Sequence, residues 1–155
     1  MPATFAKGDL FSTEGLHAYA LGSNAKGTMD RGVAVAFKKR WPKLATELAS
    51  RGAEKGGLAL GDVVAFSEGD KTVYALILQE DEGKKAKLAS LTKAVNKLVE
   101  LAAQSGIAQV GLFHPGTGKA GLDWPRVKRI LQEIGERTEV TLVVFEQFVR
   151  AKPSE

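Results

Sequence analysis

The chain has 155 residues, of which 44% are hydrophobic and 26% charged, and its formal net charge is +4. This composition is typical of a soluble globular protein with a core of its own, and the positive balance favours anionic ligands. The absence of cysteine excludes disulfides and thiolate metal sites, the two histidines lack partners at ligand spacing, and no apolar run approaches the roughly 18 residues of a membrane span.

The first half of the chain alternates short apolar runs with glycine-bearing loops. Asp30 is a candidate N-cap for the first helix. Pro42 ends that helix, because proline lacks an N–H, and it can begin the next helix, which Gly52 would end. The expected elements are strands at Thr4–Gly8 and His17–Leu21, and helices at about Gly32–Arg40 and Pro42–Ser50.

The second half of the chain begins with a predicted β-hairpin, after which helices and strands alternate again. Turn residues Glu68–Gly69–Asp70 separate two apolar runs, and apolar residues then recur at a spacing of three and four up to Gly106. Asp123 is a candidate cap for the last helix. The expected elements are strands at Asp62–Phe66 and Thr72–Leu78, a helix at Leu88–Ala102, a strand at Gln109–Phe113, a helix from Trp124 and a strand at Val140–Phe145.

Alternating strands and helices with one hairpin predict a three-layer α/β/α sandwich around a mixed sheet of about six strands. We expect a single domain over residues 1–155, with a core at about 4–146 and a polar tail at 147–155. Ligands of such sheets bind outside the carboxyl ends of the strands. Two glycine-bearing loops follow strands, so both are expected on that rim.

The first of these loops, Gly22–Arg31, leads into a helix that opens with Gly32 and Val33. Free N–H groups at a helix N-terminus and the positive end of its dipole suit a phosphate. The Asn24 amide could donate to and accept from a sugar hydroxyl, while the alternative is an Asx bond that stabilises the turn.

The second loop, PGTGKAGLDW, covers Pro115–Trp124. Its glycines let backbone amides wrap an anion, and Thr117 and Lys119 add a hydroxyl and a charge. It is no P-loop, because Phe113 and Ala120 stand where that motif needs Gly and Ser or Thr, which disfavours a nucleotide triphosphatase. An ordinary loop is the alternative.

Two further positions are candidates at strand ends. Asp9 could accept a hydrogen bond from an adenine amino group, or else cap a turn. Phe145 could stack on a base, or else belong to the core. The run Glu80–Asp81–Glu82 is interpreted as a solvated turn rather than an acid/base pair. No Cys nucleophile, G-x-S-x-G or H-E-x-x-H motif is present, and no metal or cofactor is expected.

Several segments together resemble the macrodomains, which bind ADP-ribose. They are GDLF at Gly8–Phe11, MDRGVAVAFKKRWP at Met29–Pro42, AGLDW at Ala120–Trp124 and the apolar strand ending at Phe145. The likeness covers about Thr4–Glu146. It is greatest to the branch containing the terminal ADP-ribose protein glycohydrolase and the antitoxins that remove ADP-ribose from thymidine in DNA.

The resemblance implies a binding role for ten residues. Asp9 would hold the adenine amino group, Leu10 its ring edge, and Phe145 would lie against adenine. Asn24 would face the distal ribose. The diphosphate would be bound by the amides of Gly32 and Val33 and by a second loop made of Thr117, Gly118, Lys119 and Ala120.

One departure from that branch concerns its catalytic lysine, whose place is taken by Gln79. Glutamine cannot form a Schiff base or act as a cationic acid. Asp123, the nearest match to the glycohydrolase's loop aspartate, looks more like a helix cap. A lysine-free route would hold the ribose and diphosphate while water attacks the anomeric carbon. Asn24, Gln79 or Lys119 would position that water or the leaving group.

We therefore expect an ADP-ribosyl hydrolase acting on protein Glu or Asp side chains or on thymidine-linked DNA. The alternatives are a non-catalytic reader of ADP-ribose, a phosphatase of ADP-ribose 1″-phosphate, and an unrelated α/β nucleotide-binding fold. The N-terminal segment lacks a secretory pattern, so a cytoplasmic monomer without a membrane partner is expected.

Overall fold

The computed structural model describes residues 3–30, 32–113, 115–116 and 120–146. Its strands form one six-stranded sheet in the order β1-β6-β5-β2-β4-β3, in which only the β3–β4 pair is antiparallel. The elements are β1 (Thr4–Ala6), η1 (Leu10–Ser12), β2 (Ala18–Asn24), α1 (Val33–Arg40), α2 (Pro42–Ala53), β3 (Val63–Glu68), β4 (Lys71–Gln79), α3 (Leu88–Gln104), β5 (Gln109–Phe113), α4 (Trp124–Glu136) and β6 (Thr141–Phe145).

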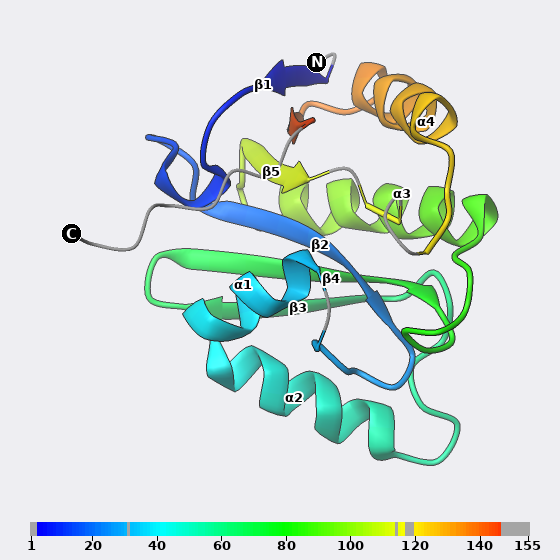
Figure 1. The fold of residues 1–155 in the computed structure, drawn as a ribbon. Coiled ribbons are helices and arrows are strands. Elements are labelled where there is room, and N and C mark those ends of the chain that lie inside the picture. Colours follow the sequence, from blue (N-terminus) through cyan, green and yellow to red (C-terminus); the bar gives the residue numbers. More distant parts are fainter. Residues whose placement is uncertain (1–2, 31, 114, 117–119, 147–155) are drawn as a thin grey trace.

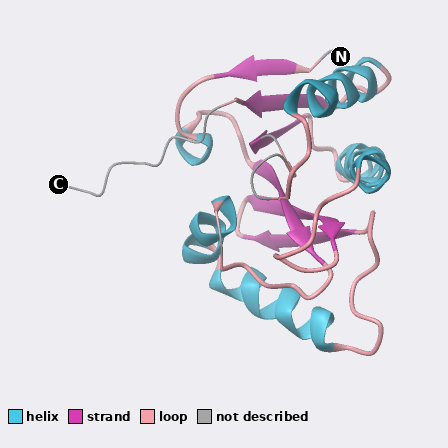
Figure 2. Cartoon of the chain, turned by 45° about the vertical axis from the view of Figure 1, so that its right-hand side comes forward, coloured by secondary structure: helices cyan, strands magenta, loops and turns pink. Residues whose placement is uncertain are grey.

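Helices cover both faces of this sheet, with α1 and α2 on one side and α3 and α4 on the other (Figures 1 and 2). Side chains of successive strand residues point to opposite faces. In β4, Tyr74 and Leu76 therefore join the core under α3 and α4, whereas Val73 and Ala75 join the core under α1 and α2. The expected three-layer α/β/α sandwich with a mixed sheet is confirmed.

The ends of two helices differ from the sequence prediction. Asp30 does not cap α1; the N-cap is Gly32, whose φ of 60° turns the chain into the helix in a conformation that suits glycine. Asp30 is exposed instead and pairs with Lys38 at 3.3 Å. Gly52 does not end α2, which continues to Ala53. Asp123 occupies the N-cap of α4 as expected, although its side chain makes no capping hydrogen bond.

Gly52 has a packing reason to be glycine. A Cβ there would overlap the carbonyl of Lys26, and a Cβ at Gly27 would overlap the carbonyl of Leu48. The loop after β2 therefore lies directly against the backbone of α2. This close approach fixes the loop that follows Asn24. No helix among the described residues is both long and apolar enough to cross a membrane.

We expect Gly27→Ala to lower the free energy of unfolding by about 3 kcal/mol or more. A positive φ alone costs an alanine about 1–2 kcal/mol, and displacement of the Leu48 backbone adds to it. Gly69→Ala is the matched control, because Gly69 has a φ of 61° and open space around its Cβ position. Urea unfolding midpoints would measure both, and equal losses would contradict the packing argument.

Candidate functional site

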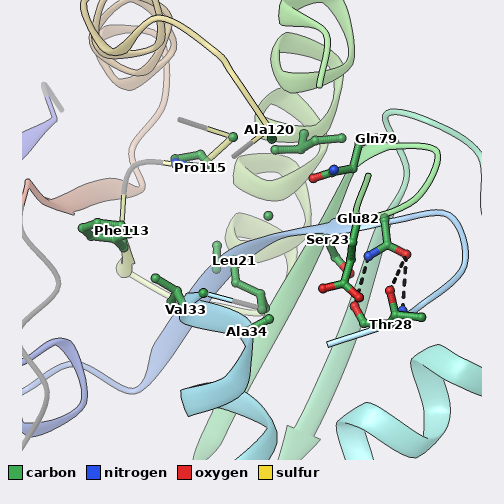
Figure 3. A pocket seen from close by; sticks show the side chains of 16 residues that line it. Leu21, Ser23, Thr28, Val33, Ala34, Gln79, Glu82, Phe113, Pro115 and Ala120 are labelled. Carbon is green, nitrogen blue, oxygen red and sulfur yellow. Dashed lines mark hydrogen bonds between the residues drawn. The ribbon is translucent and has the colours of Figure 1, made fainter. Parts of the chain in front are cut away.

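A cavity of about 350 Å³ lies at the carboxyl ends of β2 and β4, beside the start of α1 (Figure 3). This volume is in the range of small-molecule sites, about 300–1,000 Å³. The described residues that line it are Ala20, Leu21, Gly22, Ser23, Asn24, Thr28, Gly32, Val33, Ala34, Leu78, Gln79, Glu82, Phe113, Pro115, Gly116 and Ala120. The first loop and the described part of the second therefore meet at one rim.

The lining divides into an apolar and a polar end. Figure 3 shows Phe113, Val33 and Leu21 on one side, with Ser23, Thr28 and Glu82 on the other. Such a lining suits a ligand that carries hydroxyl groups at one end and an apolar surface elsewhere.

Asn24 is buried and holds the loop that follows it. Its Oδ1 accepts hydrogen bonds from the backbone N–H groups of Lys26 at 3.1 Å and Thr28 at 3.3 Å, and its Nδ2 donates to the Thr28 carbonyl at 3.0 Å. The structure thus shows the turn-stabilising alternative for Asn24, in a residue that also lines the cavity.

Ser23 precedes Asn24 and is only 5% exposed. Its Oγ is the one buried side-chain polar atom without a hydrogen-bond partner in the described part of the chain. Buried hydroxyls are normally satisfied, so an unpaired one beside a cavity is a position where a ligand can supply the partner.

Gln79 stabilises the loop after β4 through side-chain hydrogen bonds. Its Nε2 donates to the carbonyls of Asp81 and Lys84, each at 2.7 Å, which uses both hydrogens of the amide. Only its Oε1 remains to act at the cavity, so Gln79 can accept a hydrogen bond there but cannot protonate a leaving group. The sequence-based hypothesis of a catalytic Gln79 is narrowed accordingly.

Glu82 was not among the candidates from the sequence, which placed it in a solvated turn. In the structure Glu82 is half-buried and lines the cavity, and its Oε2 accepts a hydrogen bond from the N–H of Asp30 at 3.3 Å. The loop folds back because of Gln79 and because Asp81 Oδ1 accepts from the Gly83 N–H at 2.8 Å. No local sequence pattern signals this folding.

The residues expected around adenine lie outside the lining. Asp9 caps η1, accepting from the Phe11 N–H at 3.0 Å and from Ser12 Oγ at 2.7 Å, so the capping alternative is the one observed. Leu10 and Phe145 are 1% and 0% exposed and belong to the core under α1 and α2. Phe145 thus occupies the core position that the sequence left as the alternative, and the three adenine contacts remain predictions of the resemblance.

An aromatic cluster of Phe11, Tyr19, Phe37 and Trp41 connects η1 to α1, with ring centroids 5.0–5.7 Å apart. Burial raises the pKa of Tyr19 above its ordinary value, an effect that Arg40 partly offsets. The hydroxyl therefore keeps its proton and donates to the Leu16 carbonyl at 2.9 Å.

The predicted phosphate-binding residues are described only in part. Gly32 and Val33 line the cavity at the N-terminus of α1. Ala120, in the second loop, lines it too. Ala120 is held by a hydrogen bond from the Ala86 N–H to its carbonyl at 2.9 Å. Thr117, Gly118 and Lys119 lie outside the described residues.

The chain belongs to the macro domain family, whose sequence model matches residues 22–131. It is 24% identical over 142 residues to human ADP-ribose glycohydrolase OARD1, covering 92% of this chain and 90% of the relative. It is also 24% identical over 147 residues to the DNA ADP-ribosyl glycohydrolase of Mycobacterium tuberculosis, covering 92% of this chain and 41% of that protein. The chain thus spans about two-fifths of the mycobacterial relative.

Solved structures show the same fold. The macrodomain of Mycobacterium tuberculosis DarG matches with a TM-score of 0.85 at 24% identity, covering 92% of this chain and 96% of that one. Thermosipho africanus DarTG, solved in complex with ADP-ribose, matches with a TM-score of 0.81 at 16% identity, covering 97% of this chain and 43% of that one.

We expect Asn24→Ala to lower the free energy of unfolding by about 2–3 kcal/mol, because it leaves buried backbone groups without partners. Ser23→Ala is the matched control from the adjacent position. It removes a hydroxyl that has no partner among the described residues, so its effect should stay within about 0.5 kcal/mol. Urea unfolding of both variants tests this, and a large loss in Ser23→Ala would show that its hydroxyl is bonded in the free protein.

Proposed function

We propose that this protein binds ADP-ribose in the cavity and hydrolyses the bond between ADP-ribose and its acceptor. The observation that carries the proposal is the cavity at the strand ends of a macro domain fold, bounded by the N-terminus of α1. The relatives named as an ADP-ribose glycohydrolase and a DNA ADP-ribosyl glycohydrolase support the reaction. The relative solved with ADP-ribose supports the ligand.

The cavity supplies neutral binding groups. Backbone N–H groups of Gly32 and Val33, at the positive end of α1, would bind the diphosphate. The polar end, with Ser23 and Asn24, would hold the distal ribose. Orientation and exclusion of water would then promote attack of a bound water on the anomeric carbon, without the lysine that Gln79 replaces.

The proposed acceptors are a protein Glu or Asp side chain and thymidine in DNA. A carboxylate is a good leaving group that departs without a proton, which suits a site lacking the lysine. The basic residues Lys84, Lys85 and Lys87 are exposed in the loop beside the cavity and could contact the phosphates of a DNA-linked acceptor.

A non-catalytic reader is the second candidate function. It is favoured by Gln79, whose amide hydrogens are both bonded within the loop and so leave no acid at the strand end. A reader would bind ADP-ribose with the same cavity and release none.

We expect free ADP-ribose to be released from a protein mono-ADP-ribosylated on glutamate, faster than in a reaction without the protein. Chromatographic quantification over time, with thymidine-linked DNA assayed in parallel, identifies the acceptor. Intact ADP-ribose binding without release from either substrate would contradict hydrolysis and support the reader. Release of inorganic phosphate from ADP-ribose 1″-phosphate would instead indicate the phosphatase.

We expect Val33→Glu to weaken ADP-ribose binding about tenfold or more, because it places a carboxylate beside the diphosphate at the start of α1. Val35→Glu is the matched control, since Val35 is equally half-buried on α1 but does not line the cavity. Calorimetric titration should give the control an affinity within about twofold of the natural protein. Equal binding by both variants would rule out diphosphate binding at this helix.

A further inference from the structure

The polar end of the cavity holds an ionisable side chain that no sequence motif indicated. Glu82 is the one ionisable residue among the described residues that line the cavity. In Figure 3 it is drawn on the same side of the cavity as Ser23 and Thr28, which also line it. A half-buried carboxylate facing a cavity can accept a proton from a bound water.

In the loop after β4, Glu82 is the one acidic residue that lines the cavity. Gln79 fixes the carbonyls of Asp81 and Lys84, and the N–H of Asp30 binds one Glu82 oxygen across the cavity edge. The neighbouring acids are engaged elsewhere, since Asp81 bonds to the Gly83 N–H and Asp30 pairs with Lys38. A carboxylate accepts about four hydrogen bonds, so the Asp30 contact leaves Glu82 with capacity for a water.

A second observation points to a ligand at the same end. The Ser23 hydroxyl is buried there without a partner in the described part of the chain. A polar ligand or its attacking water at this end would satisfy the hydroxyl and lie beside Glu82. Among the described residues that line the cavity, the apolar end offers no comparable pair of groups.

We propose that Glu82 is the general base of the hydrolysis, an inference that rests on the proposed function. The oxygen of a bound water forms a bond to the anomeric carbon while the bond from that carbon to the acceptor breaks. The electron pair of the broken bond leaves with the acceptor, and Glu82 takes a proton from the water.

The proton balance then depends on the acceptor. A Glu or Asp carboxylate leaves as an anion, and Glu82 passes its proton to solvent. A thymine nitrogen leaves as a stronger base, and Glu82 returns the proton to it. In both cases one water is consumed, and the products are free ADP-ribose and the unmodified acceptor.

The test compares Glu82→Gln with Glu80→Gln. Glutamine at 82 keeps an oxygen for the Asp30 N–H but cannot accept a proton from water. Glu80 is exposed, lies two residues away and does not line the cavity. We expect Glu82→Gln to release ADP-ribose from a glutamate-linked substrate about 100-fold or more slowly, with calorimetric affinity for ADP-ribose within about threefold. Glu80→Gln should match the natural protein in both measurements.

Chemical rescue separates a base from a structural residue. Glu82→Ala leaves space for a small carboxylate, so added formate should restore several-fold of the lost rate, with no effect on Glu82→Gln. An unchanged rate in Glu82→Gln, a parallel loss of ADP-ribose affinity, or no rescue by formate would overturn the assignment while leaving hydrolysis intact. If the natural protein binds ADP-ribose but releases none, the proposed function itself fails and Glu82 has no reaction to serve.

Discussion

The cavity depends on how the pairing of β2 with β4 ends. These strands lie side by side within the sheet, and most residues of both are buried. The ladder shifts register between Ser23 and Asn24, so that Asn24 pairs with Gln79. Both are amides, and each turns its side chain back on its own loop to satisfy backbone groups that the ladder no longer serves. The loops after both strands begin at this point and line one end of the cavity, to which α1 and the loop after β5 also contribute.

Packing under the first loop keeps this arrangement in place. Backbone of Gly27 and Gly52 meets without intervening side chains, so α2 supports the loop that Asn24 organises. The second loop is tied at both described ends, by hydrogen bonds from Ala86 to Ala120 and from Leu122 to Gly116. A binding site held by backbone contacts on both sides needs little rearrangement to receive a ligand, which lowers the entropic cost of binding.

The sequence predicts the layers well because burial on both faces of a sheet leaves a strong pattern, as in β4, whose apolar run is continuous. Residues at the carboxyl ends of strands, such as Asn24 and Gln79, are placed at the cavity by the same logic. The predicted helix ends at Asp30 and Gly52 were wrong. At the first, the positive φ of Gly32 makes that residue the N-cap, and at the second, glycine is required by contact with the backbone of Lys26. The sequence could not predict Glu82 as a cavity residue, because its position depends on a hydrogen bond between two loops. Such a bond leaves no periodic or local signal in the sequence.

Gln79 and Glu82 are linked by the shape of their loop. A planar amide reaches two carbonyls at once, whereas an ammonium on a flexible stem binds as a point charge and fixes neither carbonyl in the same way. The amide at position 79 therefore fixes the loop in which Glu82 lines the cavity. In the proposed mechanism, the reactive group is the Glu82 carboxylate, and the hydrogen bonds of Gln79 hold the loop that carries it.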